Sequence, residues 1–394
     1  MNEGTISGKK PQIQLPAMFF LTESGIDYCI KRKIPVRDLK THLGRVKSGF
    51  SWEGFNAKLV QHLVSNMLID GIEINRSDFL SRRTEIIDLT KLIVYGILYK
   101  KIRPTLNEIL YKSDLISKLR RNNPRAARDN QLHFDPKVVG KFMTENAKAV
   151  RSLKAGLLYE PYALIQRDSS LTEDQKKTKM QITQKFIDVI EPNTWFLFHY
   201  ISKSNDKMEV FSRINNLLVS FVQKTKIADY IALMLMEILQ NAEKTHFENL
   251  AMRDNMARAP GIEIADLLKD DDFRRKLRQK AEANKIHVNL TFSLEGNINN
   301  ARERQRLHIS VANKGMMGEV ERRNLQKRTK TEVKSASLAD FFQAGDQDNL
   351  GGGLGLLYLS YLQDACKSED IVFDARIISD DQREETIATV HISI

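Results

Sequence analysis

The chain has 394 residues, of which 42% are hydrophobic and 28% are charged, and its net charge is +11. This composition is typical of a globular protein and excludes a chain that is disordered throughout. The first residues lack the apolar run of a signal peptide, and the apolar runs at 92–98 and 195–201 are too short to span a bilayer, so we expect a cytoplasmic protein without a membrane span. Cys29 and Cys366 lie far apart, which predicts neither a disulfide nor a structural zinc site.

The positive charge is concentrated in the first half of the sequence. Residues 1–200 contain 33 Lys and Arg against 21 Asp and Glu, whereas residues 201–394 contain 28 against 29. A basic half of this kind can attract nucleic acid, an acidic protein or an anionic membrane surface. A solvated basic surface without a partner is the alternative, because charge alone specifies little.

Residues 1–165 are predicted to form a mostly helical, basic domain of unknown role. Apolar residues recur there at helical spacing, and proline or glycine separates the segments. In the polar stretch that follows, Ser170 and Glu173 fit a capping box for a helix at about 171–190. We therefore predict a helical connector over residues 166–192.

The pattern changes past Pro192, and residues 193–394 are predicted to form one α+β domain. Its predicted elements are, in chain order, a strand at 194–202, helices at 207–223 and 227–251, a charged helix at 263–284, strands at 286–296 and 306–315, a helix after a glycine run at 349–355, and strands at 370–379 and 386–394. This order favours a mixed sheet with helices on one face, in a sandwich preceded by the mostly helical domain.

An isolated carboxylate interrupts the apolar part of the helix predicted at 227–251. Over residues 231–239 every residue is apolar except Glu237, and burying a carboxylate without a partner is costly. Asn241 and Lys244 follow Glu237 at four and seven positions, so the three side chains lie on one face. Two oxygen-bearing groups one turn apart can hold a hydrated Mg²⁺ that bridges to phosphates. A polar stripe on the solvent side of the helix is the alternative interpretation.

Four glycines lie just ahead of an apolar, helix-like run. The stretch NLGGGLGLLYLSYL begins at Asn349 and includes Gly351, Gly353 and Gly355. Glycine at a helix start loses backbone entropy, and the usual reason to accept this cost is that a ligand comes close to the backbone. Backbone N–H groups of a glycine loop at a helix N-terminus form an anion site. A linker without a ligand is the alternative.

Three motifs in this order resemble those of the histidine kinase-like (GHKL, Bergerat-fold) ATPases. EILQNAEKTH, at 237–246, is similar to their E-x-x-x-N-A-x-K box, and the residues from Gly351 to Leu356 are similar to their G-x-G-L-G-L motif. Between the two, HISVANKGMMG occupies the place of the box that contacts adenine, and the last two strands resemble the closing β-hairpin of the family. The resemblance covers about residues 193–394.

The resemblance implies that the chain binds ATP and Mg²⁺. By this resemblance Glu237 would position or activate the attacking group and Asn241 would bind Mg²⁺, with Lys244 adding positive charge. The other residues that it places at the nucleotide are Asn313 and Gly315 in the adenine box, Gly351, Gly353, Leu354 and Gly355 at the phosphates, and Thr386 on the closing hairpin. The segment 316–350 would form a lid.

Two positions depart from the family pattern. The Asp that contacts adenine in the family falls on Asn313, whose amide oxygen can still accept a hydrogen bond but carries no charge. The missing charge is expected to lower the affinity for adenine. Met316 and Met317 follow Gly315 in place of the second glycine of that box.

None of the eight histidines has the sequence context of a phosphoaccepting histidine in a sensor kinase. The elements predicted at 194–248 are similar instead to the start of the anti-sigma-factor serine kinases. Three functions stay open, namely a signalling protein kinase or ATPase, a nucleotide-binding switch without turnover, and a nucleic-acid-associated protein that binds through its basic half. The expected partners are ATP, a signalling protein and, in the third case, nucleic acid, and a dimer is one open oligomeric state.

Overall fold

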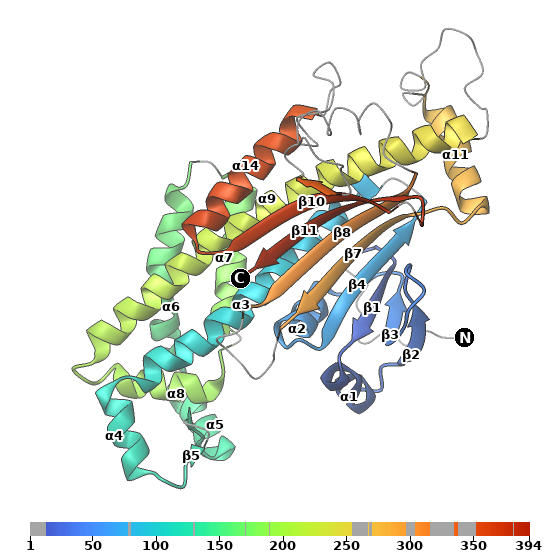
Figure 1. Cartoon of the computed structure of the whole chain (residues 1–394). Helices are drawn as coiled ribbons and strands as arrows, with labels where there is room; N and C mark the ends of the chain where they lie inside the picture. Colours follow the sequence, from blue (N-terminus) through green and yellow to red (C-terminus); the bar gives the residue numbers. More distant parts are fainter. Residues whose placement is uncertain are drawn as a thin grey trace. The chain divides into compact units, whose positions relative to one another are not determined.

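The computed structural model describes residues 13–77, 80–128, 131–169, 171–188, 190–253, 267, 270–296, 304–315, 335–337, 352–380 and 382–394. The chain divides into two compact units, which are Met1–Ile97 with Ile227–Ile394, and Leu98–Lys226 (Figure 1). We call the first the sheet unit and the second the helical unit. Two long helices, α3 (Thr84–Tyr111) and α9 (Lys207–Arg253), contribute residues to both.

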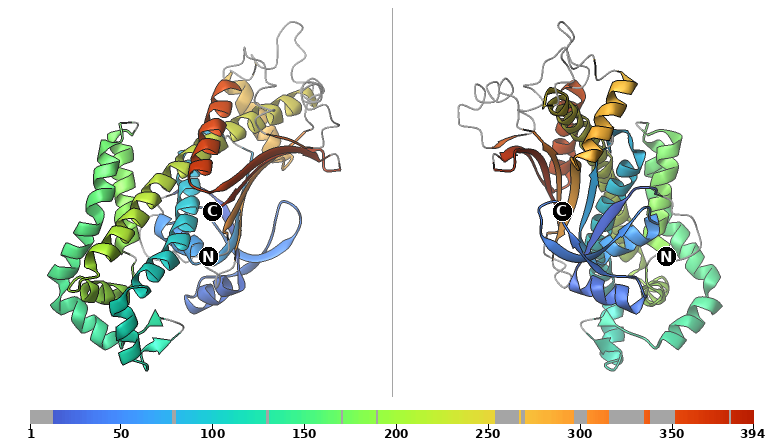
Figure 2. Two further views of the ribbon diagram at one scale, coloured as in Figure 1. Left: turned by 60° about the vertical axis from the view of Figure 1, so that its left-hand side comes forward. Right: turned by 90° about the vertical axis from the view of Figure 1, so that its right-hand side faces the viewer.

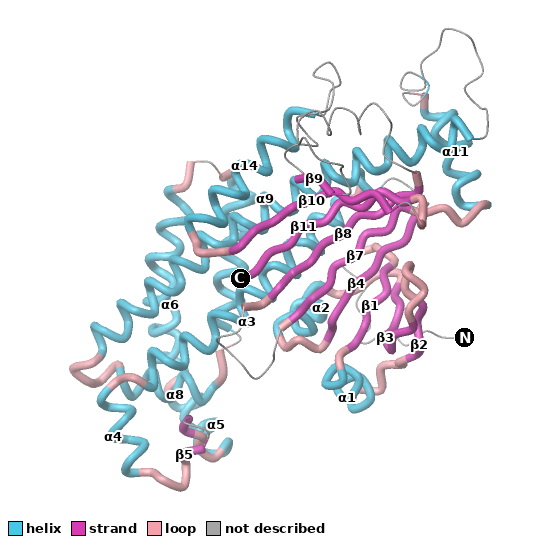
Figure 3. The backbone as a smooth tube through the Cα atoms, in the orientation of Figure 1, coloured by secondary structure: helices cyan, strands magenta, loops and turns pink. Residues whose placement is uncertain are grey.

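The described part of the sheet unit contains one nine-stranded sheet (Figure 3). All neighbouring strands in it run antiparallel. The strands are, in order across the sheet, β2 (Arg37–Lys40), β3 (Val46–Trp52), β1 (Ala17–Leu21), β4 (Ile69–Arg76), β7 (Val288–Glu295), β8 (Arg306–Lys314), β11 (Glu385–Ser393), β10 (Val372–Asp380) and β9 (Ser335–Ser337). The α+β class is confirmed. The predicted mixed sheet is wrong, because even β8 and β11, which are far apart in sequence, pair antiparallel.

Helices cover one face of this sheet, and the core of the unit lies between the sheet and these helices. The helical elements of the sheet unit, besides parts of α3 and α9, are α1 (Glu23–Lys31), α2 (Ala57–Ser65), η1 (Leu80–Arg82), α11 (Asp271–Ala283) and α14 (Gly352–Ser368). Figure 2 shows α9 and α14 on the same side of the curved sheet. In β7 every second residue, from Val288 to Leu294, is buried, as expected for a strand with one covered face.

Four strands of the sheet come from the first 97 residues, which the sequence predicts to be mostly helical. β4 pairs with β7 from Gly71 opposite Ser293 to Arg76 opposite Val288, so these N-terminal residues extend the C-terminal sheet. The division predicted at residues 165 and 192 therefore does not coincide with the two units. β1 is a five-residue apolar run, which is too short to show whether its period is that of a strand or of a helix. β4 starts four residues after the end of α2, so its apolar residues cannot be distinguished by periodicity from a continuation of that helix.

The helical unit lies between the two segments of the sheet unit in sequence. Its elements, besides parts of α3 and α9, are α4 (Asp114–Asn122), β5 (Ala127–Arg128), β6 (Gln131–Leu132), α5 (Pro136–Glu145), α6 (Ala147–Arg167), α7 (Glu173–Asp188) and α8 (Pro192–Ile201). The predicted connector helix exists as α7, which packs along α6 inside the unit. The capping box predicted for Ser170 and Glu173 is formed instead by Thr172 and Gln175, whose side chains each accept a hydrogen bond from the other's backbone N–H, at 3.3 Å and 2.9 Å. Ser170 lies outside the described residues.

The segment predicted as a strand at 194–202 is part of helix α8. Pro192 occupies the first turn of this helix, and Trp195, Phe198 and Ile201 are buried at a spacing of three residues. This spacing is helical, and it outweighs the preference of the aromatic residues for strands. The two helices predicted at 207–223 and 227–251 are one continuous helix, α9.

Two further expectations concern cysteines and the membrane. Cys29 and Cys366 are both buried and unpaired, and burial raises the pKa of each thiol, that of Cys366 to about 12. Within the described residues, no helix is long and apolar enough to cross a bilayer.

Candidate functional site

The three predicted residues of the box on α9 form a stripe that runs from the core to the surface. Glu237 is 7% exposed, Asn241 is half-buried one turn later, and Lys244 is exposed. Oε1 of Glu237 is buried and has no hydrogen-bond partner among the described residues. Burial raises the pKa of this carboxyl above its usual value. Because such a group costs stability, it is a candidate for function rather than for packing.

A second buried carboxylate on α9 provides the contrast. Glu243 is 2% exposed, and it accepts hydrogen bonds from the backbone N–H of Ser81 at 3.0 Å and from the Ser81 hydroxyl at 2.5 Å. Ser81 lies in η1, just ahead of α3, so Glu243 ties this part of the chain to α9. Glu243 therefore has a structural role, which Glu237 lacks.

The end of β8 and the start of β11 bring three predicted residues together. Asn313 lies opposite Thr386 in the strand pairing, and Oγ1 of Thr386 donates a hydrogen bond at 2.8 Å to the carbonyl of Gly315. The N–H of Gly315 donates at 2.9 Å to the carbonyl of Glu384. Asn313 is 3% exposed, and its Nδ2 is buried without a partner in the described part of the chain. This amide thus has a donor available for a ligand.

Gly315 brings this strand end against α9. Its φ is +120°, which residues with a side chain rarely adopt, and a Cβ there would lie 1.9 Å from Nδ2 of Asn249. Nδ2 of Asn249 is also buried without a described partner. α9 therefore carries both the predicted E-x-x-x-N-A-x-K box and the contact with the strand of the predicted adenine box. Asn249 is not among the predicted site residues, although its position eight residues after Asn241, about two helical turns, is a signal that could have found it.

The predicted glycine motif lies at the start of α14. Gly353, Leu354 and Gly355 belong to the first turn of this helix, whereas Gly351 and the predicted lid, apart from β9, lie outside the described residues. The rings of Tyr361 on α14 and Tyr230 on α9 are 5.8 Å apart, and the two helices run in opposite directions (Figure 1).

From this tyrosine contact, the start of α14 and the box on α9 lie in the same direction along the two helices. Eight residues separate Gly353 from Tyr361, and eight separate Tyr230 from Ile238. Because each residue of a helix rises by about 1.5 Å, the first turn of α14 and the turn that begins at Glu237 lie at similar distances along their helices from this contact. The free N–H groups of that first turn can bind an anion there.

The arrangement combines groups that can hold a polar, anionic ligand. Several buried polar atoms on α9 and β8 have no hydrogen-bond partner among the described residues, and Glu237 Oε1, Asn249 Nδ2 and Asn313 Nδ2 are three of them. The described residues contain no group of three or more His, Cys, Asp or Glu side chains that could hold a metal ion. A Mg²⁺ ion held by one amide oxygen, phosphates and water needs no such group.

A buried histidine follows the box on α9. His246 is 2% exposed, and neither of its ring nitrogens has a hydrogen-bond partner among the described residues. Burial, with a smaller contribution from His287, lowers the pKa of His246 to about 4. His246 is therefore neutral at pH 7 and acts as part of the core rather than as an ion-pair partner.

Acid should destabilise the protein through this side chain. The unfolded state binds a proton to His246 below about pH 6.5, whereas the folded state does so only near pH 4, so stability falls as the pH drops through this range. We expect His246→Phe to lessen the loss in free energy of unfolding between pH 7 and pH 5 by about 2 kcal/mol. Urea denaturation at both pH values measures this, with His391→Phe, at an exposed position, as the control. If the free energy of unfolding falls equally between pH 7 and pH 5 in the wild-type and His246→Phe proteins, the prediction is wrong.

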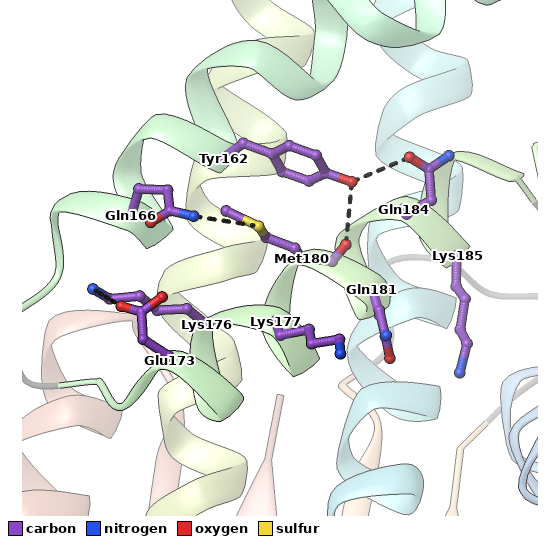
Figure 4. A pocket seen from close by; sticks show the side chains of 9 residues that line it. All are labelled: Tyr162, Gln166, Glu173, Lys176, Lys177, Met180, Gln181, Gln184 and Lys185. Carbon is purple, nitrogen blue, oxygen red and sulfur yellow. Dashed lines mark hydrogen bonds and ion pairs between the residues drawn. The ribbon is translucent and has the colours of Figure 1, made fainter.

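A separate surface pocket lies between α6 and α7 of the helical unit (Figure 4). It has a volume of about 610 Å³ and includes Tyr162, whose hydroxyl contacts the Gln184 side chain at 3.1 Å and the Met180 carbonyl at 3.4 Å. Lys176 on its wall is paired with Glu173 at 2.9 Å. None of the predicted site residues lines this pocket, and we assign no ligand to it.

Comparisons with known proteins place the chain in a family but give no activity. The chain belongs to a family of unknown function, DUF8084, whose model matches residues 8–394. It is also similar to an uncharacterized protein of Treponema pallidum (strain Nichols), with 28% identity over 371 residues, which cover 94% of each chain. No solved structure matches it.

Proposed function

We propose that this member of the DUF8084 family binds Mg-ATP in its sheet unit and acts as a nucleotide-dependent signalling regulator. The observation that carries the proposal is that Glu237 Oε1 and Asn249 Nδ2 on α9 and Asn313 Nδ2 on β8 are buried and have no hydrogen-bond partner among the described residues. Natural proteins leave few such atoms, and a bound ligand is a common reason for those that remain.

The residues present fit a nucleotide. Asn241 would hold Mg²⁺, and the free N–H groups at the start of α14 would hold phosphates, with Lys244 nearby in sequence to add positive charge. Asn313 and Thr386 would face the base at the end of the sheet. Bound ATP would supply a transferable phosphoryl group whose charge Mg²⁺ neutralises. The likeness to the histidine kinase-like ATPases rests on these motifs.

Calorimetric titration of the full chain tests the proposal. We expect saturable binding of one ATP per chain in the presence of Mg²⁺ and much weaker binding when EDTA removes the metal. AMP, which lacks the phosphates that the start of α14 would hold, should bind at least tenfold more weakly. Absence of any ATP binding at millimolar concentration would refute the proposed function.

Turnover separates a kinase or ATPase from a switch that only binds. If the protein is an enzyme, Glu237→Gln should still bind Mg-ATP but lose phosphoryl transfer, because the amide cannot accept a proton from the attacking group. If the wild-type protein binds Mg-ATP and changes its partner affinity without turnover, the non-catalytic switch is the correct form of the proposal.

The two buried carboxylates of α9 should respond oppositely to the same change. We expect Glu237→Met to raise the free energy of unfolding by about 1 kcal/mol at pH 7, because it removes an unpaired carboxyl from the core. Its raised pKa means that this penalty grows as the pH rises above the usual carboxyl range. Glu243→Met should lower the free energy by about 1–3 kcal/mol, because it removes the acceptor of the Ser81 N–H and hydroxyl.

Urea denaturation of both variants at pH 7 measures the contrast. Destabilisation of equal size in the two variants would show that Glu237 has a structural partner, and the functional interpretation of its carboxyl would be lost.

A further inference from the structure

The net positive charge of the protein belongs entirely to the helical unit. Residues 98–226 hold 24 of the 61 Lys and Arg residues but only 13 of the 50 Asp and Glu residues, which gives +11. The remaining 37 basic and 37 acidic residues of the sheet unit cancel. The proposed nucleotide site therefore does not account for the basic character of the chain.

Within the helical unit, cations gather at the end of α4 and in the turn after it. We call Lys118, Arg120, Arg121 and Arg125 the basic corner. Lys118, Arg121 and Arg125 are exposed and Arg120 is half-buried, whereas Ile116 on the opposite side of α4 is fully buried. Lys118 and Arg121 lie three residues apart and so project from one face of the helix.

Two carboxylates of the helical unit, Asp206 and Asp135, accept hydrogen bonds from backbone N–H groups. Asp206 accepts a hydrogen bond from the backbone N–H of Leu115 at 3.0 Å, and Asp135 accepts one from Lys137 N–H at 2.8 Å, at the start of α5. Asp114, on the same face as Lys118, lies in the first turn of α4, where the helix dipole favours a negative charge. No carboxylate of the described residues forms an ion pair with the basic corner.

The turn that carries Arg125 is held in place by the surrounding elements. The N–H of His133 donates to the carbonyl of Ala126 at 2.8 Å. The N–H of Leu132 donates to Oη of Tyr111 at 3.0 Å, and Nδ2 of Asn193 donates to the Leu132 carbonyl at 2.6 Å. The cations are thus presented on a fixed scaffold, which lowers the entropy cost of binding a partner.

We propose that the basic corner binds the phosphate backbone of a nucleic acid. Three of its four cations are arginines, whose planar guanidinium groups bind phosphate oxygens in pairs. Among the described residues of α4 and the turn, none is an exposed large hydrophobic side chain of the kind that anchors a membrane surface or a protein partner. A surface with unpaired cations and no apolar anchor matches a polyanion that is bound mainly by charge.

Fluorescence anisotropy of a labelled 20-base-pair duplex with the full chain tests this proposal. Affinity should fall steeply with salt, and the slope of log K against log salt should be about 0.9 for each phosphate contact. Arg121→Ala combined with Arg125→Ala should weaken binding about tenfold or more at 50 mM salt and make the slope shallower by about 1.8. The matched control is Lys177→Ala with Lys185→Ala on α7, which removes the same charge from two exposed lysines that form no ion pair with any described residue.

The control separates a site from general attraction. Unchanged slope in the control, with a reduced slope in the Arg121 and Arg125 variant, would support the proposal. Equal losses in the two variants, or no salt-dependent binding of the duplex, would overturn it. Tighter binding to polyglutamate or to phosphatidylserine vesicles than to the duplex would also overturn it and assign the corner to an acidic protein or a membrane. None of these outcomes depends on ATP binding.

Discussion

Replacing Asn241 by alanine should weaken the binding of Mg-ATP at least about a hundredfold and leave the fold intact. A hundredfold change corresponds to about 2.7 kcal/mol, which is within the range expected when a metal ligand or a charged hydrogen bond is removed. Asn241 is half-buried on α9, one turn after Glu237, and no hydrogen bond of its side chain holds the fold together among the described residues. Titration calorimetry with Mg-ATP measures the loss.

The matched control is Asn216→Ala, an exposed amide on the same helix. It removes the same chemical group and should leave the affinity for Mg-ATP unchanged. Circular dichroism should show the same helix content in the wild-type and both variants. Equal affinities in folded Asn241→Ala and wild-type proteins would remove Asn241, and with it the metal position, from the proposed site.

Replacing Gly25 by alanine should destabilise the sheet unit by about 3 kcal/mol or more. Gly25 lies in the first turn of α1, and a Cβ there would be 1.8 Å from the carbonyl oxygen of Leu68. That oxygen is fixed, because it accepts a hydrogen bond from Thr22 N–H at 3.1 Å, and Thr22 Oγ1 donates to the neighbouring Met67 carbonyl at 2.9 Å. The methyl group must therefore push α1 away from the start of β4. This movement would weaken both the packing of α1 and the hydrogen bonds of Thr22 at its N-terminus.

Gly140→Ala provides the opposite expectation. Gly140 lies inside α5 with nothing within 4 Å of the position of its Cβ, so alanine there should stabilise the protein by up to about 1 kcal/mol. Urea denaturation followed by circular dichroism compares the two variants. A Gly25→Ala protein as stable as the wild type would mean that α1 does not pack against Leu68 as described.

The C-terminal strands could be predicted, and the predicted ranges match the observed ones closely. β7 buries every second residue, and β8 does so as far as Val311, whereas β10 and β11 alternate less regularly. The N-terminal strands could not be predicted in this way. β2 is four residues long and exposes three of them, and β4 is buried on most positions, so neither shows the alternation.

The limits of the site prediction are also physical. The spacing of Glu237 and Asn241 on a helix fixes their relation to each other, so their common stripe could be predicted. The contact of Gly315 with Asn249 joins a strand end to a helix 66 residues earlier, and a single sequence contains no measure of that distance. The burial that leaves Oε1 of Glu237 unpartnered likewise depends on what packs around α9, which is a tertiary property.

Amide hydrogen exchange across the full chain, with and without Mg-ATP, tests the central claim most directly. If the sheet unit binds the nucleotide, peptides that cover residues 237–249 of α9, the end of β8 at 309–315, and the start of α14 should exchange more slowly with Mg-ATP. Peptides from α6 and α7 of the helical unit should exchange at the same rate in both states. Unchanged exchange in all three segments of the sheet unit, at a millimolar concentration of ATP with Mg²⁺, would contradict the proposed nucleotide site.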